Sequence, residues 1–209
     1  GYSVDFEAER VERFLAQQTA AARPFFLYYS ISPPHCPVAD APESYRKLYA
    51  PAEVPLRPNV DPQNPFPNPE YWFKVYRWDF RHYSLRLPFT ERLPDGYGLR
   101  NLIAEYLGMV TWMDAAVGRM LDALDRAGLA EDTLVVFTSD HGDCLGSLGL
   151  PQKGSPTEES IRVPLLWRWP GRLPAGHVAS TAVPSLVDIA PTLLRMAGVE
   201  VPSPMQGCD

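Results

Sequence analysis

A long helical pattern between two short apolar runs constrains the fold of this chain more than any other feature. Residues 100–127 repeat apolar side chains at helical spacing, and Gly128 is a typical residue just beyond a helix end. The run PFFLYYS, residues 24–30, precedes this pattern, and TLVVFTS, residues 133–139, follows it. Both runs have the length and composition of buried strands. Helix alternating with strand predicts an α/β layered domain with a mainly parallel sheet flanked by helices.

Other segments extend this alternation. Residues 4–18 and 185–199 have helical spacing, and residues 161–169 are interpreted as a strand. Pro164 indicates that this strand lies at an edge or carries a bulge. Residues 31–98 hold a cluster of prolines and many apolar side chains, so an ordered but irregular insertion is expected there.

The composition excludes some partners. The formal net charge is -6, which argues against the basic surface by which proteins hold nucleic acid, so no nucleic-acid partner is expected. No apolar run is long enough to span a membrane. The three cysteines have neither CxxC spacing nor the spacing of a zinc site, and they are interpreted as ordinary thiols.

Polar side chains follow the two apolar runs at the points where strands should end. Asp140 and His141 come directly after one run, and His35 follows the other. Ligands of open α/β sheets bind beyond the carboxyl ends of the strands, so these side chains are expected at one edge of the sheet. A carboxylate beside an imidazole suits a divalent cation. The alternative is a structural turn in which Asp140 bonds nearby backbone amides, and Asp143 is expected to bond backbone rather than metal.

Four segments in this order resemble the sulfatase family of the alkaline phosphatase superfamily. They are PFFLYYSISPPHCP, the long helix ending in TSDHGD, a lysine followed by EESIRVP, and VPSLVDIAPTLLRMAGVEVPSPMQG. The resemblance implies an alkaline-phosphatase-like fold, of which this chain would be a partial domain. Residues 1–209 are then expected to be part of a single sulfatase-type catalytic domain with an aromatic and Pro-rich insertion at about 31–98.

The resemblance also implies roles for individual residues. Asp140 and His141 would be metal ligands, Lys153 would contact the sulfate and the bridging oxygen, and His35 would point at the sulfate ester. Negative charge develops on the leaving oxygen during sulfate-ester hydrolysis, and a cation or proton donor there stabilises the transition state. The metal implied by the family is calcium, while an imidazole ligand also suits manganese or zinc.

The chain departs from the family pattern at several points. Leu148 stands where a histidine is common, and Thr157 stands where an aromatic residue often precedes the paired acids. No cysteine lies in the C-x-P-S-R type motif that is oxidised to formylglycine, and the paired aspartates that complete the metal site are not found. The formylglycine nucleophile is therefore expected upstream of this chain, and the chain alone is expected to be inactive.

Residues 66–89 interleave aromatic with basic side chains and allow two interpretations. One is a hydrophobic cluster under a long loop. The other is a substrate wall, in which Trp72 and Trp78 stack on sugars or aryl groups and Arg77 meets further sulfates. Arg162 is expected to brace the paired acids just before it, with a place near the sulfate as the alternative.

The sequence thus favours a sulfuric ester hydrolase that acts on a sulfated carbohydrate or an aryl sulfate by a metal-assisted formylglycine mechanism. A small-molecule or glycan sulfate ester is the expected partner. Two alternatives stay open: a phosphomonoester or phosphodiester hydrolase of the same superfamily, and a non-catalytic module that binds sulfated glycans. The family resemblance suggests a periplasmic, secreted or lysosome-like compartment.

Overall fold

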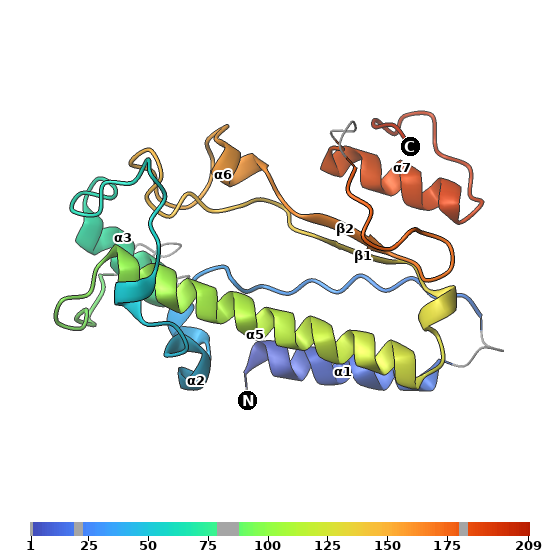
Figure 1. Cartoon of the computed structure of the whole chain (residues 1–209), viewed down its shortest axis with the longest axis horizontal. Coiled ribbons are helices and arrows are strands. Elements are labelled where there is room, and N and C mark those ends of the chain that lie inside the picture. Colours follow the sequence, from blue (N-terminus) through green and yellow to red (C-terminus); the bar gives the residue numbers. More distant parts are fainter. Residues whose placement is uncertain (1, 19–22, 79–87, 180–183) are drawn as a thin grey trace. The chain divides into compact units, whose positions relative to one another are not determined.

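The computed structural model describes residues 2–18, 23–78, 88–179 and 184–209 (Figure 1). The chain divides into two compact units, Gly1–Pro170 and Gly171–Asp209. The first unit holds every residue proposed above for the site. Whether both units belong to one catalytic domain stays a prediction.

Two helices, α1 (Ser3–Gln17) and α5 (Leu99–Arg126), lie side by side in the first unit (Figure 1). The apolar face of α1 is buried against α5, because its apolar side chains recur at helical spacing. Arg119 of α5 holds the carboxylate of Glu12 with two hydrogen bonds of 3.1 and 2.9 Å. Both helices begin and end one residue before the bounds predicted from the sequence.

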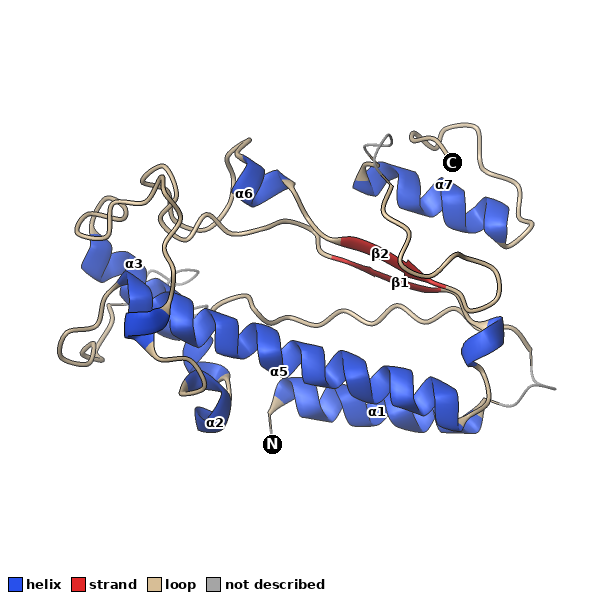
Figure 2. Cartoon of the chain, viewed as in Figure 1, coloured by secondary structure: helices blue, strands red, loops and turns tan. Residues whose placement is uncertain are grey.

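The strands that the structure describes form one antiparallel pair (Figure 2). Strand β1 (Val135–Thr138) lies against β2 (Leu165–Arg168), with Val135 opposite Arg168 and Thr138 opposite Leu165. The parallel strands expected from the sequence are not among the strands described. Pro164 lies just outside β2, and its carbonyl accepts a hydrogen bond of 2.9 Å from the Thr138 hydroxyl. The strand is therefore shorter than the predicted 161–169.

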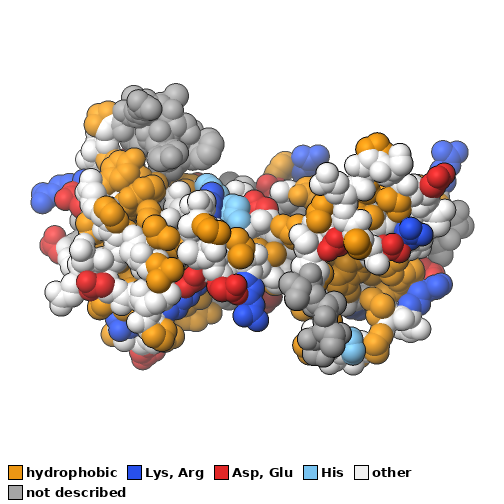
Figure 3. Space-filling view, turned by 90° about the horizontal axis from the view of Figure 1, so that it is seen from above, with side chains coloured by type: hydrophobic (Ala, Val, Ile, Leu, Met, Phe, Trp, Pro, Cys, Tyr) orange, Lys and Arg blue, Asp and Glu red, His pale blue; other side chains and the backbone are white. Residues whose placement is uncertain are grey.

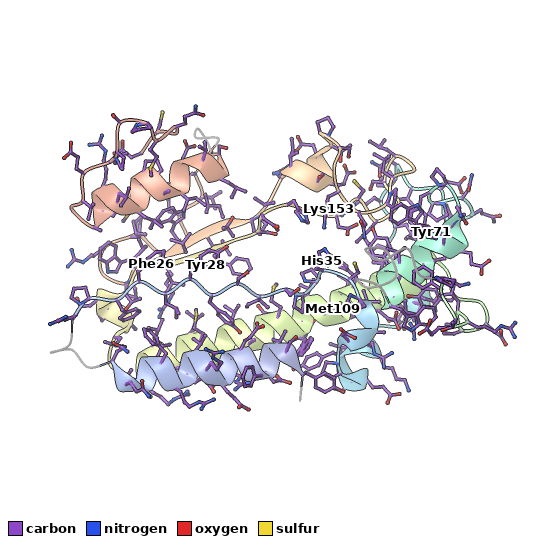
Figure 4. All side chains as sticks on the ribbon, turned by 180° about the vertical axis from the view of Figure 1, so that it is seen from behind. Phe26, Tyr28, His35, Tyr71, Met109 and Lys153 are labelled. Carbon is purple, nitrogen blue, oxygen red and sulfur yellow. The ribbon has the colours of Figure 1, made fainter. Side chains whose placement is uncertain are left out.

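Residues 24–30 are extended but are not assigned as a strand, so this prediction is corrected. The expected alternation is present. Phe25, Leu27 and Tyr29 pack against the core, whereas Phe26 and Tyr28 are 81% and 80% exposed (Figure 4). A strand assignment needs a hydrogen-bonded neighbour, and the described residues contain no strand that pairs with this segment.

Short elements fill the region between residues 31 and 98. They are η1 (Val38–Asp40), α2 (Glu43–Arg46), η2 (Pro51–Glu53) and α3 (Pro69–Trp78). Side chains of η1 and α3 join those of α1 and α5 in the larger core cluster, which includes Val38, Phe66, Phe73, Tyr76, Leu102 and Trp112. The described part of the insertion is therefore ordered, as predicted, and carries part of the core.

Two further short helices flank the strands: η3 (Ala130–Asp132) precedes β1, and α6 (Glu158–Ile161) precedes β2. The second unit contains α7 (Leu186–Met196), inside the predicted 185–199. Asp188 caps this helix by accepting the Ser185 amide at 2.8 Å, and it also accepts the Cys208 amide at 2.8 Å. None of the helices in the described segments combines the length and hydropathy needed to cross a membrane.

Candidate active site

A lysine and a histidine that are 118 positions apart meet in the first unit (Figure 4). His35 follows the extended segment, Lys153 lies in the loop after β1, and Nζ of Lys153 is 3.0 Å from Nε2 of His35. Nδ1 of His35 is 2.8 Å from the carbonyl oxygen of Cys36. A carbonyl only accepts, so Nδ1 carries the proton and Nε2 accepts from the lysine ammonium. The two residues assigned by resemblance to one sulfate are thus in contact.

The second pair of proposed residues follows β1 directly. One oxygen of Asp140 accepts the amide of His141 at 2.9 Å, which is the structural turn considered above. The other oxygen is 3.4 Å from Nε2 of His141. Nδ1 of His141 is 2.9 Å from the Gly142 carbonyl, so Nδ1 is protonated and Nε2 presents its lone pair toward the carboxylate. The structural turn is therefore present, and the role of Asp140 as a metal ligand stays a prediction that would use the other oxygen.

The donor set fits part of a divalent metal site. The Asp140 carboxylate is largely exposed and the His141 nitrogen is oriented by a backbone carbonyl, as in many histidine ligands. Within the described residues, no three His, Cys, Asp or Glu side chains group closely enough to hold a metal ion. Calcium takes about six to eight oxygen ligands, so this pair alone does not complete a site.

Asp143 bonds a backbone amide, as the sequence predicted, and it also bonds a tyrosine hydroxyl. Its Oδ1 accepts the Tyr76 hydroxyl at 2.7 Å and the Leu145 amide at 3.0 Å. Burial raises the pKa of the Asp143 carboxyl, and the hydrogen bonds from Tyr76 and Leu145 and the charge of Lys153 oppose that rise. Tyr76 also accepts the Gln152 amide, so the turn that carries Asp143 and the loop that carries Lys153 meet at one side chain.

The turn after β1 is held against α6 by a backbone contact that only glycine permits. The Gly142 amide donates to the Ser160 carbonyl at 2.8 Å. A Cβ at this position would lie 2.0 Å from the carbonyl oxygen of Glu159. The close approach of Gly142 to α6 fixes the direction of the chain immediately after Asp140 and His141.

The insertion braces the loop that follows the turn. Arg57 donates to the Cys144 carbonyl at 2.9 Å and to the Ser147 hydroxyl at 3.0 Å. The Leu148 amide donates to the Asn59 carbonyl at 3.1 Å. Sequence reasoning missed this support, because a lone arginine in a Pro-rich segment has the same pattern as a solvated surface residue.

The loop between the two candidate pairs contains strained backbone. Leu145, Leu148 and Gln152 have φ values of 45°, 56° and 51°, a region that residues with a side chain rarely adopt. Such conformations persist only where the surrounding contacts impose them, and they gather at functional sites. Leu148, the departure from the family histidine, is 60% exposed.

Helix α3 places the aromatic residues of the insertion in two settings. Phe73 and Tyr76 are buried in the core, which favours the packing interpretation for them. Trp72 and Trp78 are half-buried, and their role as a substrate wall stays a prediction. Residues 79–87 of the aromatic stretch lie outside the described residues.

The two arginines proposed for sulfate binding have protein partners. Arg77 forms an ion pair with Glu105, which is buried, and its guanidinium lies over the rings of Trp78 and Tyr97 at 5.5 and 5.1 Å. Arg162 lies 4.0 Å from Glu158 in an exposed pair, so the predicted brace is confirmed. A direct role for either arginine at a sulfate stays a prediction.

The surface near the site mixes basic and imidazole side chains. Histidine side chains reach the surface next to a basic side chain in Figure 3. His35 and Lys153 are both exposed and His141 is partly exposed, so a ligand could reach all three. An anion is the ligand that this charge favours.

Sequence comparison links this chain to a family of known proteins. The sequence profile described as Sulfatase matches residues 1–199. The ulvan-active sulfatase of Formosa agariphila is 31% identical over 210 residues, which is 100% of this chain and 35% of that protein. This chain therefore spans about a third of the length of that relative.

Solved structures with a similar fold include a protein bound to a sulfated sugar and a hydrolase of phosphonate monoesters. A structure of a protein in complex with its substrate D-glucosamine-2-N,6-O-disulfate has a TM-score of 0.78 at 26% identity, and the match covers 100% of this chain and 51% of that one. A phosphonate monoester hydrolase from Silicibacter pomeroyi has a TM-score of 0.73 at 31% identity, covering 96% and 39%. These similarities support the alkaline-phosphatase-like fold, of which this chain is a partial domain with mixed helix and strand.

Proposed function

Because this chain belongs to the sulfatase family, we propose that the complete protein containing it hydrolyses sulfate esters of a carbohydrate or an aryl alcohol. The observation that carries the proposal is the 3.0 Å contact between Lys153 and His35, which come from two separate family-like segments. Asp143 follows the Asp140–His141 pair in the same turn, and Tyr76 links Asp143 to the loop that carries Lys153.

Lys153 and His35 supply charge and a proton at the ester. The ammonium of Lys153 neutralises a sulfate oxygen. In the structure, Nε2 of His35 accepts the hydrogen bond of Lys153. When a substrate oxygen accepts that bond instead, Nε2 of His35 is released. Nε2 is unprotonated at that point, so it first takes up a proton from solvent and then donates that proton to the leaving oxygen, where negative charge develops. Both residues therefore act mainly on the transition state.

Asp140 and His141 would hold a divalent cation through the carboxylate oxygen and the imidazole Nε2. Calcium is the family's ion, and the imidazole also suits manganese or zinc. When bound, such an ion offsets the charge of the sulfate and lowers the pKa of a nucleophile beside it. The formylglycine nucleophile is proposed to come from a part of the protein upstream of these residues.

The substrate class is proposed from the relatives and from the aromatic side chains of α3. One structural neighbour is bound to a glucosamine disulfate. Half-buried Trp72 and Trp78 offer ring faces for a sugar or an aryl group. Arg77 and Arg162 are the candidate contacts for a second sulfate, although each would have to leave or share its carboxylate partner.

The test is alanine substitution of Lys153 and His35 in the complete protein, assayed with a chromogenic aryl sulfate. Each variant should lower kcat by roughly a hundredfold or more with an unchanged melting temperature. Lys47→Ala is the matched control, because Lys47 is exposed and pairs with Glu43 one helical turn away. A raised KM with kcat unchanged would reduce the residue to a substrate contact.

A second candidate function is hydrolysis of phosphonate or phosphate esters, favoured by the similarity to a phosphonate monoester hydrolase. Both reactions displace a group at a tetrahedral anion. The same aryl leaving group on sulfate, phosphonate and phosphate diester substrates separates them by the ranking of kcat/KM. Binding of sulfated glycans without turnover of any ester would favour a non-catalytic module.

A further inference from the structure

We propose that Tyr76 is a positioning residue that holds the Lys153 loop against the turn carrying Asp140 and His141. The inference rests on the proposed function, because it assigns to Tyr76 the task of placing Lys153 for the reaction. Tyr76 comes from α3, far from both segments in the sequence, and its side chain is 2% exposed.

The phenol oxygen of Tyr76 joins the two segments. Its hydroxyl donates to Oδ1 of Asp143 at 2.7 Å, and the backbone amide of Gln152 donates to the same oxygen. A phenol has one proton and two lone pairs, so both bonds form in one orientation. The Cys144 amide also donates to the Gln152 carbonyl at 2.6 Å. The Gln152 amide is therefore fixed by Tyr76 of α3, and the Gln152 carbonyl is fixed by the turn.

Gln152 controls the direction of the chain into Lys153. Its φ of 51° is unfavourable for a residue with a side chain, so it needs contacts that impose it. The bond from the Gln152 amide to Tyr76 is one such contact. Without it the backbone of Gln152 can relax, and the Lys153 ammonium leaves its position 3.0 Å from His35.

The ring of Tyr76 is held independently of its hydroxyl. It packs in the larger core cluster, and its centroid is 6.4 Å from that of Phe66. Tyr76→Phe therefore keeps the ring and removes only the two hydrogen bonds of the oxygen. The change isolates the link between the loops from the packing of α3.

Tyr97 provides a matched control. Its hydroxyl donates to the buried Glu105 at 2.7 Å, and its ring packs against the same core cluster, but none of its described contacts reaches the Lys153 loop. Tyr76→Phe and Tyr97→Phe each remove a phenol–carboxylate hydrogen bond, and Tyr76→Phe also removes the bond from the Gln152 amide, so it should lower the melting temperature somewhat more. A purely structural role predicts that the two variants keep the same kcat.

The experiment measures kcat, KM and melting temperature in the complete protein with an aryl sulfate. Tyr76→Phe should lower kcat by roughly ten- to a hundredfold with little change in KM, because small displacements of a catalytic group are costly. Tyr97→Phe should keep kcat within about twofold. In a Lys153→Ala background, Tyr76→Phe should add almost nothing, because the residue that it positions is gone.

Each contrary outcome has a separate meaning. No turnover of the aryl sulfate by the complete parent protein overturns the proposed function, and an unchanged kcat in Lys153→Ala overturns this inference together with the catalytic role proposed for Lys153. A lowered kcat in Lys153→Ala, with Tyr76→Phe matching Tyr97→Phe, overturns the positioning role alone. Additive losses in the Tyr76→Phe, Lys153→Ala double variant also overturn it, because Tyr76 would then act without Lys153.

Discussion

Replacing Gly142 with alanine should displace the turn that carries Asp140 and His141, because the added methyl group would collide with backbone. The new Cβ would lie 2.0 Å from the carbonyl oxygen of Glu159 and 3.1 Å from its carbonyl carbon. Relieving a contact this short needs a shift of more than about 1 Å, since non-bonded carbon contacts settle near 3.5 Å. Both sides of the contact are backbone, so no side chain can rotate away.

The expected cost is about 3 kcal/mol, the upper end of the range for overpacking, because the shift also breaks the 2.8 Å hydrogen bond from Gly142 to Ser160. Thermal unfolding of the complete protein measures it, with turnover as a second readout because Asp140 and His141 precede the displaced residue. Gly118→Ala is the control. Gly118 lies in α5, where an added methyl group would meet no neighbouring atom within 4 Å. The change should therefore stabilise the folded protein by about 0.5–1 kcal/mol. A Gly142→Ala variant as stable and active as the parent would refute the reasoning.

Asp140→Asn and His141→Ala should each lower metal content and turnover of the complete protein, and full metal content by elemental analysis in both would contradict the ligand assignment. Trp72→Ala or Trp78→Ala should change the ranking of sulfated substrates more than the melting temperature; a large fall in melting temperature with an unchanged ranking would favour simple packing. The hydrogen bonds from Arg119 hold the pKa of Glu12 below its usual range, so this pair stabilises the fold above the ordinary glutamate pKa and loses that effect as the pH falls through the lowered pKa. The stability gap between the parent and Glu12→Gln, under about 1 kcal/mol, should therefore be largest near neutral pH and close in acid; a gap independent of pH would contradict this.

The helices could be predicted from the sequence because their pattern is local. The apolar repeats of α1 and α5 alone set their bounds to within one residue. The segment at 24–30 shows the limit of such patterns. Its alternation is present, with Phe26 and Tyr28 outward, but a strand also requires a neighbour that the pattern does not identify.

Some features of the candidate site could likewise be predicted from the sequence, and others could not. The family-like segments assigned Lys153 and His35 to one sulfate, and their contact agrees with that assignment. The ends of the apolar runs predicted only that His35 would lie at the same edge as Asp140 and His141. The support from Arg57 and Tyr76 was not predicted. Both bond to backbone groups of a distant loop, and such bonds leave no periodic pattern in the sequence. One arginine and one tyrosine in an irregular insertion are identified only once the insertion is folded.

The separation of Lys153 and His35 in the sequence also bears on the order of folding. Their contact closes a loop of 118 positions, whereas the turn at Gly142 closes against Ser160 over a short stretch of chain. Loop-closure entropy must be overcome before a distant contact forms, so the turn should organise early and the Lys153–His35 contact late. During synthesis, the histidine leaves the ribosome long before its lysine partner exists. A late contact of this kind slows unfolding more than it speeds folding, and it therefore contributes to the lifetime of the folded state rather than to the route by which that state is reached.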